Sequence, residues 1–528
     1  MIRALILPLA YLPLLASCDD GAPQGQSAAA PAAKPNILLV VWDTVRTDRL
    51  SLYGHGRLTT PYLDEWAKEA RVFENCLSVG SNTVPSHAAM FTGLFAAEHG
   101  VTNEQPYLAE QFETLAELLH AAGYSTYLFS ENPHICARNN FTQGFDVAEH
   151  PWSPQYQAEA IRLTRRKLDA ADLSSELPED FKQRRLTQWS IKAAGRLAQQ
   201  GALNWLSQQD RDRPFFIFLN YMEAHRPLIP PRRYRRPIMT PDEVEASYRV
   251  DRRWESTWSY VFRLHEYTPA ELELTRATYD AALLELDHLF HNLLEGLRTG
   301  GYLEKTLVVL VSDHGEHLGE HHMFDHQYSV YEPLVRIPLV VHYPTRLAPG
   351  REQRPVMNLD LFPTLLELAG IHPPVKSKAV SLLRPLEKRL RMSEYPAIMR
   401  EAFERERELY PDFDSTPWNR TLRAYYDEPH KFIEASDGHH ELYNLDDDPG
   451  ELRNLLDEQP QLSLRLAADL QHYVRSLKKI TTTQPQRPSP PMDEAHQRRL
   501  EALGYLSTPQ DTNEEGDSKR PEQNDEKP

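Results

Sequence analysis

The sequence predicts an α/β fold, in which buried strands form a sheet that is layered with helices, and two patterns support this prediction. Apolar runs of strand length, rich in β-branched and aromatic residues, occur at 36–42, 214–221 and 306–311. Such runs are typical of strands that are buried on both faces of a largely parallel sheet. Apolar residues at helical spacing lie between these runs, at 112–122, 189–208 and 271–299.

A second, smaller subdomain is expected because the pattern changes after residue 366. Short strand candidates, separated by turns such as Ser436-Asp437-Gly438, occur at 395–400, 421–426, 430–435 and 441–445. This pattern predicts a small antiparallel sheet followed by a final helix. We therefore assign residues 35–385 to a main domain and 386–480 to a C-terminal α+β subdomain. The helical, charged stretches at 151–213 and 228–266 are expected to elaborate the surface.

The N-terminal residues resemble an export signal. They contain one arginine, an apolar stretch and small residues before Cys18, and the stretch is shorter than the roughly 20 apolar residues of a membrane-spanning helix. Leu15-Ala16-Ser17-Cys18 resembles a bacterial lipobox, whose cysteine is lipidated and becomes the new N-terminus. A plain signal peptide that happens to end in cysteine is the alternative. We expect a signal peptide at 1–17 and a flexible linker at 18–34.

The net charge and the two ends of the chain indicate which partners and which location to expect. In known lipoproteins an Asp after the lipidated cysteine, as Asp19 is here, implies retention at the inner membrane. We expect a lipid-anchored protein on the periplasmic face of a bacterial cell envelope. A net charge of −18 argues against nucleic acid as a partner, because phosphate contacts need a basic surface. The polar, Pro-containing residues 481–528 are expected to form an extended or disordered tail.

Polar residues follow the apolar runs where a ligand crevice is expected. Asp43 follows the first run, His225 follows the second, and Asp313-His314 follow the third. The carboxyl ends of parallel strands form the binding crevice of an α/β sheet. Taken alone, an Asp after a strand is more often a helix cap, and an Asp-His pair is more often structural. Two carboxylates, an imidazole and the Thr83 hydroxyl together form a set that can hold a divalent cation and activate that hydroxyl.

Several segments carry a resemblance to a known family. They are PNILLVVWDTVRTDRLSLYG, TVPSHAAMFTGLFAAEHGV, PFFIFLNYMEAHRPLIPP, LVVLVSDHGEHLGEHHMFDH and ELYNLDDDPGE, which resemble sulfatase-family segments in family order. The sulfatase family belongs to the alkaline phosphatase-like superfamily. The resemblance implies a mixed sheet flanked by helices, a smaller C-terminal antiparallel sheet, and metal-assisted hydrolysis of a sulfate or phosphate ester.

The resemblance also implies site residues. The metal ligands are Asp43, Thr83, Asp313 and His314. His225 and His326 match family positions that touch the ester oxygens or protonate the leaving group. Asn132 matches a substrate-facing position loosely, and a turn asparagine is the equal alternative. The nearby His317, His321 and His322 are interpreted as solvated side chains.

The nucleophile segment departs from the family pattern. Sulfatases convert a Cys or Ser into formylglycine at the position that Thr83 occupies. Oxidation of threonine gives a ketone, never an aldehyde, so we expect no formylglycine. His87 replaces the arginine of the sulfatase signature and is a candidate substrate-binding residue. TVPSH resembles the Thr-Phe-Pro-Asn-His of the nucleotide pyrophosphatase/phosphodiesterase group.

The predicted metal ligands also differ from the sulfatase pattern. Asp43-Thr44 and Asp313-His314 stand where sulfatases usually have Asp-Asp and Asp-Asn. An imidazole ligand favours manganese or zinc, whereas calcium and magnesium stay possible. We expect one divalent metal ion. In the two-metal alternative, His225 and His326 serve a second zinc, but the matching Asp is absent and only Glu223 lies nearby.

The threonine at position 83 affects which class of ester the protein is expected to hydrolyse. A sulfated formylglycine releases sulfate by elimination, whereas a sulfated threonine has no second hydroxyl and cannot react in this way. Phosphothreonine can be cleaved by in-line attack at phosphorus. We expect hydrolysis of phosphodiester or phosphonate-type esters, or of sulfate esters, through a covalent Thr83 intermediate. The alternatives are an arylsulfatase-like enzyme, a lipid head-group phosphotransferase and a non-catalytic binding protein. The expected substrate is a small-molecule, glycan or lipid head-group ester.

The two remaining cysteines allow a disulfide but do not establish one. Cys76 and Cys136 can pair in an exported protein, but their separation in space is not fixed by the sequence. Cys76 is otherwise interpreted as a small buried side chain.

Overall fold

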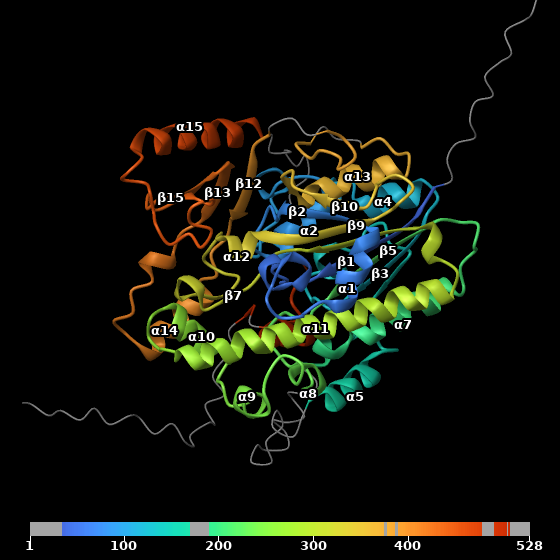
Figure 1. The fold of residues 1–528 in the computed structure, drawn as a ribbon, viewed down its shortest axis with the longest axis horizontal. Helices are drawn as coiled ribbons and strands as arrows, with labels where there is room; N and C mark the ends of the chain where they lie inside the picture. Colours follow the sequence, from blue (N-terminus) through green and yellow to red (C-terminus); the bar gives the residue numbers. More distant parts are fainter. Residues whose placement is uncertain are drawn as a thin grey trace, which may run out of the picture. The chain divides into compact units, whose positions relative to one another are not determined.

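The computed structural model describes residues 34–168, 189–373, 377–385, 389–477, 490–503 and 505–506 (Figure 1). The main sheet is formed by β1 (Asn36–Trp42), β2 (Arg71–Leu77), β3 (Ser125–Ser130), β4 (Val147–Glu149), β5 (Phe215–Tyr221), β6 (Thr306–Ser312), β9 (Arg336–His342), β10 (Gly350–Glu352) and β11 (Val356–Met357). Within the described residues these nine strands lie in the order β10-β2-β9-β6-β1-β5-β3-β4, with β11 paired to β2. The three strands that the apolar runs predict are therefore confirmed as β1, β5 and β6.

The sheet is mixed. β1 lies between β5 and β6 and pairs with both in parallel, while β9 pairs antiparallel with β6 and with β2. Six of the seven residues of β1 are buried, which explains its unbroken apolar run. This parallel centre places the carboxyl ends of β1, β5 and β6 side by side.

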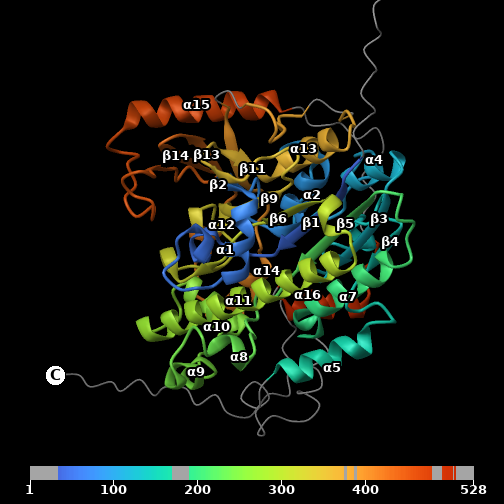
Figure 2. The ribbon, with the colours of Figure 1, turned by 45° about the vertical axis from the view of Figure 1, so that its right-hand side comes forward.

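Helices cover both faces of the sheet. α7 (Gly195–Leu206) and α11 (Pro269–Thr299) cover one face, and α2 (Thr83–Thr92), α4 (Leu115–Ala121) and α13 (Leu361–Leu368) cover the other (Figure 2). Successive residues of β1 point to opposite faces: Leu38 and Val40 pack toward α11, whereas Leu39 and Val41 pack toward α2. The helix predicted over 189–208 is divided, because a 3₁₀ turn, Trp189–Ala193, precedes α7.

Further short elements surround this core. The helices are α1 (Pro61–Trp66), α3 (Ala96–His99), α5 (Gln157–Lys167), α8 (Arg232–Arg235), α9 (Pro241–Ser247), α10 (Trp254–Val261), α12 (Glu332–Val335) and α14 (Glu401–Leu409). A two-stranded ribbon is formed by β7 (His317–Leu318) and β8 (Phe324–Asp325). Cys76 and Cys136 are buried and unpaired, so the structure contains no disulfide between them.

The C-terminal subdomain contains the predicted antiparallel sheet. Its strands are β12 (Arg391–Tyr395), β13 (Leu422–Asp427), β14 (His430–Ala435) and β15 (Glu441–Asn444), in that order, and α15 (Pro460–Ser476) packs on them. The strand predicted at 395–400 is wrong, because β12 ends at Tyr395. Pro396 follows, and a proline has no N–H to donate to a ladder.

The prediction of an extended or disordered tail over 481–528 is wrong for one segment, which forms helix α16 (Glu494–Ala502). The Asp493 side chain caps this helix by accepting a 2.7 Å hydrogen bond from the His496 N–H. His496, Leu500 and Leu503 are buried, and their spacing of four and three residues gives the helix one buried stripe. The predicted signal peptide and linker, up to residue 33, lie outside the described residues. In the part of the chain that the structure describes, no helix has the length and apolarity needed to cross a membrane.

Candidate active site

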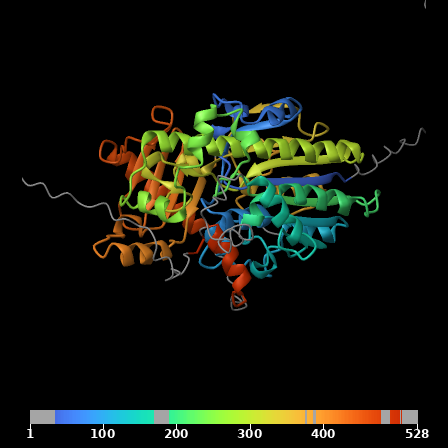
Figure 3. The same cartoon turned by 90° about the horizontal axis from the view of Figure 1, so that it is seen from below.

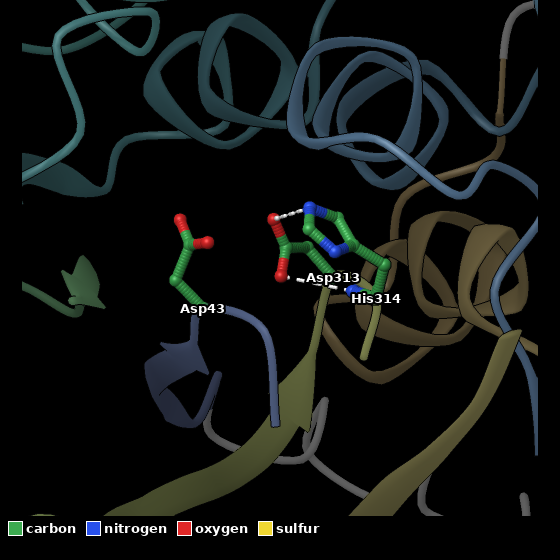
Figure 4. Close-up of side chains that lie close together, drawn as sticks. All are labelled: Asp43, Asp313 and His314. Carbon is green, nitrogen blue, oxygen red and sulfur yellow. Dashed lines mark hydrogen bonds and ion pairs between the residues drawn. The ribbon is translucent and has the colours of Figure 1, made fainter. Parts of the chain in front are cut away.

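The predicted metal ligands meet at the carboxyl ends of β1 and β6. Trp42, the last residue of β1, lies opposite Ser312, the last residue of β6, so that Asp43 and Asp313 follow at the same edge. The possible ligand atoms of Asp43, Asp313 and His314 all lie within 4.8 Å of one another and are buried. In Figure 4 the carboxylate of Asp43 faces that of Asp313, and the His314 ring lies beside Asp313.

Hydrogen bonds fix the orientation of Asp313 and His314. The backbone N–H groups of Thr44 and His314 donate to Asp313 Oδ1 over 3.1 and 2.9 Å. His314 Nδ1 lies 2.9 Å from the Gly315 carbonyl oxygen. Because a carbonyl only accepts, Nδ1 carries the proton and Nε2 presents its lone pair. A histidine held through one nitrogen in this way is typical of metal ligands.

The site fits a divalent cation. Asp43 Oδ1 and Asp313 Oδ2 are buried and, among the described residues, have no hydrogen-bond partner. Burial and the nearby Asp313 carboxylate raise the pKa of Asp43 to about 7. Burial likewise raises the pKa of Asp313 to about 7. A cation between the two carboxylates removes this penalty, since buried charges are stable only when they are paired or coordinate a metal.

Thr83 lies where the sequence predicts a nucleophile. It is the first residue of α2, so its hydroxyl lies at the positive end of a helix dipole. Its Oγ1 is 3.1 Å from His314 Nε2. The hydroxyl therefore adjoins the candidate metal ligands and an end of the helix that favours negative charge.

His87 lies one turn further along α2. Its Nδ1 donates to the Thr83 carbonyl oxygen over 2.9 Å and lies 3.6 Å from Asp313 Oδ2. Burial lowers the pKa of His87 to about 3, so the ring is neutral. His87 therefore contacts both the nucleophile segment and a candidate metal ligand.

Asn132 also belongs to the site. It follows β3, and its Nδ2 donates to Asp43 Oδ2 over 2.9 Å. Asn220 Nδ2 approaches the same oxygen at 3.4 Å. The sequence analysis missed Asn220, whose signal is a polar side chain near the carboxyl end of the otherwise apolar β5. These amides hold Asp43 from the side of β3 and β5.

His225 and His326 have opposite charge preferences, although their ring centroids lie only 5.3 Å apart. Burial holds the pKa of His225 well below its usual value. Burial also disfavours the charged form of His326, but Asp325 and Glu316 outweigh this effect and hold its pKa well above the usual value. His326 Nδ1 is 2.6 Å from Asp325 Oδ1 and 3.9 Å from Glu316 Oε2. The site thus pairs a neutral imidazole with an imidazolium.

A second group of side chains has the spacing of metal ligands. It consists of Glu316, Asp325 and His326. Glu223, which the two-metal alternative considers, is not part of this group. Its Oε1 instead accepts a 3.3 Å hydrogen bond from the Gly195 N–H.

The interpretation of the neighbouring histidines as solvated is wrong for His317. This side chain is fully buried, and its Nε2 lies 3.1 Å from Ser329 Oγ. The loop folds back as the β7–β8 ribbon and covers it. His321 and His322 are partly buried and stack on Tyr331 and Tyr260 with ring centroids 3.9 Å apart in each pair.

Sequence analysis also missed Tyr505, from the segment after α16. Its hydroxyl oxygen is 3.0 Å from His225 Nε2, 3.2 Å from Asn132 Nδ2 and 3.4 Å from Thr83 Oγ1. No local signal marks this tyrosine, because its role depends on a contact across 422 residues of sequence. Beside it lies a cavity of about 570 Å³, lined by His134, Gln327, Leu500 and others, which is of ligand-binding size.

Two family models match the chain. The model described as Sulfatase matches residues 35–371, and the model described as N-sulphoglucosamine sulphohydrolase, C-terminal, matches residues 319–479. Similar curated proteins include the N-acetylglucosamine-6-O-sulfatase of Bacteroides thetaiotaomicron, with 27% identity over 85% of this chain and 86% of that protein. The arylsulfatase of Clostridium perfringens is 24% identical over 81% of this chain and 91% of that protein.

Solved structures share the fold. The phosphonate monoester hydrolase of Agrobacterium radiobacter superimposes with a TM-score of 0.64 at 22% identity, over 84% of this chain and 96% of that one. A protein in complex with its substrate, D-glucosamine-2-N,6-O-disulfate, gives a TM-score of 0.63 at 22% identity, over 84% of this chain and 99% of that one. The mixed sheet, its helices and the C-terminal antiparallel sheet therefore match sulfatase-like structures.

Proposed function

The chain belongs to the sulfatase family of ester hydrolases, and from this premise we propose that it is a metal-dependent hydrolase of phosphodiester or phosphonate-type esters with Thr83 as its nucleophile. The observation that carries the proposal is the position of the Thr83 hydroxyl, at the N-terminus of α2 and 3.1 Å from His314 Nε2. A threonine at this position supplies an alcohol and excludes formylglycine.

Asp43, Asp313, His314 and the Thr83 hydroxyl are the residues that would hold the cation. When bound, the cation offsets negative charge on the ester and lowers the pKa of the neighbouring hydroxyl. Manganese and zinc fit the imidazole in this ligand set best. We assign one metal ion to the site. We assign Glu316 and Asp325 to the His326 imidazolium that they flank. Metal analysis that gives two equivalents per chain would instead assign these three side chains to a second ion.

The protein side chains have separate roles in the proposed reaction. Thr83 first loses its hydroxyl proton to solvent, and the resulting alkoxide oxygen forms a bond to phosphorus while the bond from phosphorus to the leaving oxygen breaks. His326, held protonated by Asp325 and Glu316, donates its proton to that leaving oxygen. Water then attacks the phosphorus of phosphothreonine, one water proton returns to His326, and Thr83 leaves as the alkoxide that begins the next cycle. His87 and Asn132 position Thr83, Asp313 and Asp43 through the contacts given above.

Sulfate esters are the second candidate substrate. Two similar proteins are named as sulfatases, and the family model points the same way. Phosphorus is preferred on chemical grounds, because a sulfated threonine lacks the elimination by which formylglycine releases sulfate, whereas phosphothreonine can be cleaved by in-line attack at phosphorus. The similar fold of a phosphonate monoester hydrolase is consistent with that preference.

The test compares three 4-nitrophenyl esters with manganese-loaded protein: a phosphate diester, a phenylphosphonate and a sulfate. We expect the two phosphorus esters to give the higher kcat/KM. Thr83→Ala should reduce turnover by about 10³-fold or more, whereas Thr83→Ser, which keeps the hydroxyl, should retain measurable turnover. Efficient sulfate hydrolysis with little phosphoester hydrolysis refutes the substrate preference, and an active Thr83→Ala variant refutes the nucleophile.

We further propose that the protein is lipidated at Cys18 and anchored at the periplasmic face of the inner membrane. The proposal is supported by the lipobox-like residues 15–18 and by Asp19. Metabolic labelling with a fatty-acid probe should mark the wild-type chain and not Cys18→Ala. An unlabelled wild-type chain contradicts the proposal.

A further inference from the structure

The hydroxyl of Tyr505 lies at the centre of the candidate active site. It is within hydrogen-bonding distance of Thr83, Asn132 and His225, which come from three separate elements of the main domain. His225 Nδ1 lies 2.6 Å from the Arg226 carbonyl oxygen, so Nδ1 carries the ring proton and Nε2 accepts. The Tyr505 O–H therefore donates to His225, and the Asn132 amide donates to the Tyr505 oxygen.

The segment that carries Tyr505 is firmly docked. Leu503 is 1% exposed and packs with Ile191 and Met222. The Arg499 guanidinium lies 4.8 Å from the centre of the Trp152 ring. The Tyr505 ring itself meets His134 edge to face, with centroids 4.4 Å apart. Figure 3 shows α16, in red, against the teal and blue elements of the main domain.

Tyr505 lies beside both a cavity and the nucleophile segment. The carboxylate oxygens Asp43 Oδ1 and Asp313 Oδ2 have no protein partner among the described residues, so the tyrosine does not take the place of the cation. A cavity of about 570 Å³ has Tyr505 and Leu500 in its wall, whereas the buried Thr83 is not among the described residues that line it. The contact with Thr83 Oγ1 is long, at 3.4 Å, and is readily exchanged for a substrate oxygen. Tyr505 therefore lies between this cavity and Thr83, where a substrate oxygen that reaches Thr83 meets the phenol hydroxyl.

We propose that Tyr505 is a substrate-binding residue whose phenol O–H turns from His225 to a non-bridging oxygen of the phosphoryl or sulfuryl group placed at Thr83. The proposal rests on the proposed function and adds a neutral donor to it. The Asn132 amide donates to the Tyr505 oxygen and so leaves the phenol O–H free to donate elsewhere. A tyrosine phenol is ordinarily protonated at neutral pH, so the hydroxyl can donate. The C-terminal segment thereby completes the active site of the main domain.

The test removes only the hydroxyl. Tyr505→Phe keeps the ring and its packing, and should lower kcat/KM for the best 4-nitrophenyl ester by about 100-fold, as loss of one oxyanion donor does. Glu494→Gln, on the exposed side of α16, is the matched control and should retain wild-type turnover. Leu503→Ala, which weakens the docking, should lower turnover as Tyr505→Phe does.

A second measurement does not depend on turnover. Titration calorimetry of the manganese-loaded protein with inorganic phosphate and with sulfate should show binding at least about 10-fold weaker in Tyr505→Phe than in the wild type, the loss of roughly one hydrogen bond to a charged group. A merely structural tyrosine changes the melting temperature and leaves this affinity alone.

The outcomes separate the two proposals. Wild-type activity that Thr83→Ala abolishes and Tyr505→Phe leaves unchanged or increases overturns the role of Tyr505 and keeps the proposed function. An increase identifies the segment as an inhibitory plug. If no ester is hydrolysed, the proposed function fails, and the anion titrations still decide whether Tyr505 binds an oxyanion.

Discussion

At the scale of single residues, the site is defined by two buried carboxylates, each with one oxygen that has no hydrogen-bond partner among the described residues. Asp43 and Asp313 each have a pKa raised to about 7 by burial, with mutual repulsion adding to the effect at Asp43. A protein tolerates such a pair where a cation completes it. Neighbouring charges also explain why the two histidines differ. Asp325 and Glu316 lie beside His326 and favour its charged form. The described contacts of His225 include a backbone carbonyl and no carboxylate.

These raised pKa values make the stability of the metal-free protein depend on pH. The folded state holds protons on Asp43 and Asp313 that the unfolded chain releases near pH 4. This contribution is fully present below pH 4 and is lost as the pH rises to about 7. Manganese should therefore raise the melting temperature more at pH 8 than at pH 5. At pH 8 and 100 times its dissociation constant, it should add about 2.7 kcal/mol to the free energy of unfolding.

Thermal unfolding at both pH values, with and without manganese, checks this prediction. The Asp43→Asn, Asp313→Asn double variant is the control and should lose both the pH dependence and the response to manganese. Metal analysis of the wild type should give one equivalent per chain. An equal manganese effect at both pH values contradicts the assignment of these carboxylates.

At the scale of elements, helix α2 sets the position of Thr83, the proposed nucleophile. Gly93 caps the C-terminal end of this helix with a left-handed φ of +70°. A Cβ at this position would lie 2.7 Å from the Phe362 ring on α13. Gly123, with a φ of +93°, meets nothing within 4 Å. A side chain would therefore strain the left-handed backbone at both glycines, but only at Gly93 would it also clash with a neighbouring residue.

Replacing each glycine by alanine isolates the clash. Gly123→Ala should destabilise the protein by about 1 kcal/mol, the cost of a left-handed alanine. Gly93→Ala should cost about 1–3 kcal/mol more, because it overpacks the contact between α2 and α13, and it should also lower turnover by shifting Thr83. Urea unfolding and ester hydrolysis measure the two effects. Equal destabilisation by both substitutions would show that α13 does not fix α2.

At the scale of the whole molecule, what the sequence revealed was local. β1, β5 and β6 were predictable because burial on both faces leaves an unbroken apolar run, and Asp43, Asp313 and His314 were predictable because they follow those runs directly. Tyr505 was not predictable, since its role arises from docking of α16 far along the chain. The end of β12 at Tyr395 and the burial of His317 likewise depend on tertiary packing.

The central claim is that Thr83 forms a covalent bond to phosphorus during turnover. The direct measurement is acid quenching of the manganese-loaded protein during hydrolysis of the phosphate diester, followed by peptide mass spectrometry. We predict a phosphoryl adduct on the peptide that contains Thr83, absent from Thr83→Ala and from unreacted protein. Turnover without any adduct on Thr83, under conditions where a burst of 4-nitrophenol equal to the enzyme concentration is seen, would contradict the claim.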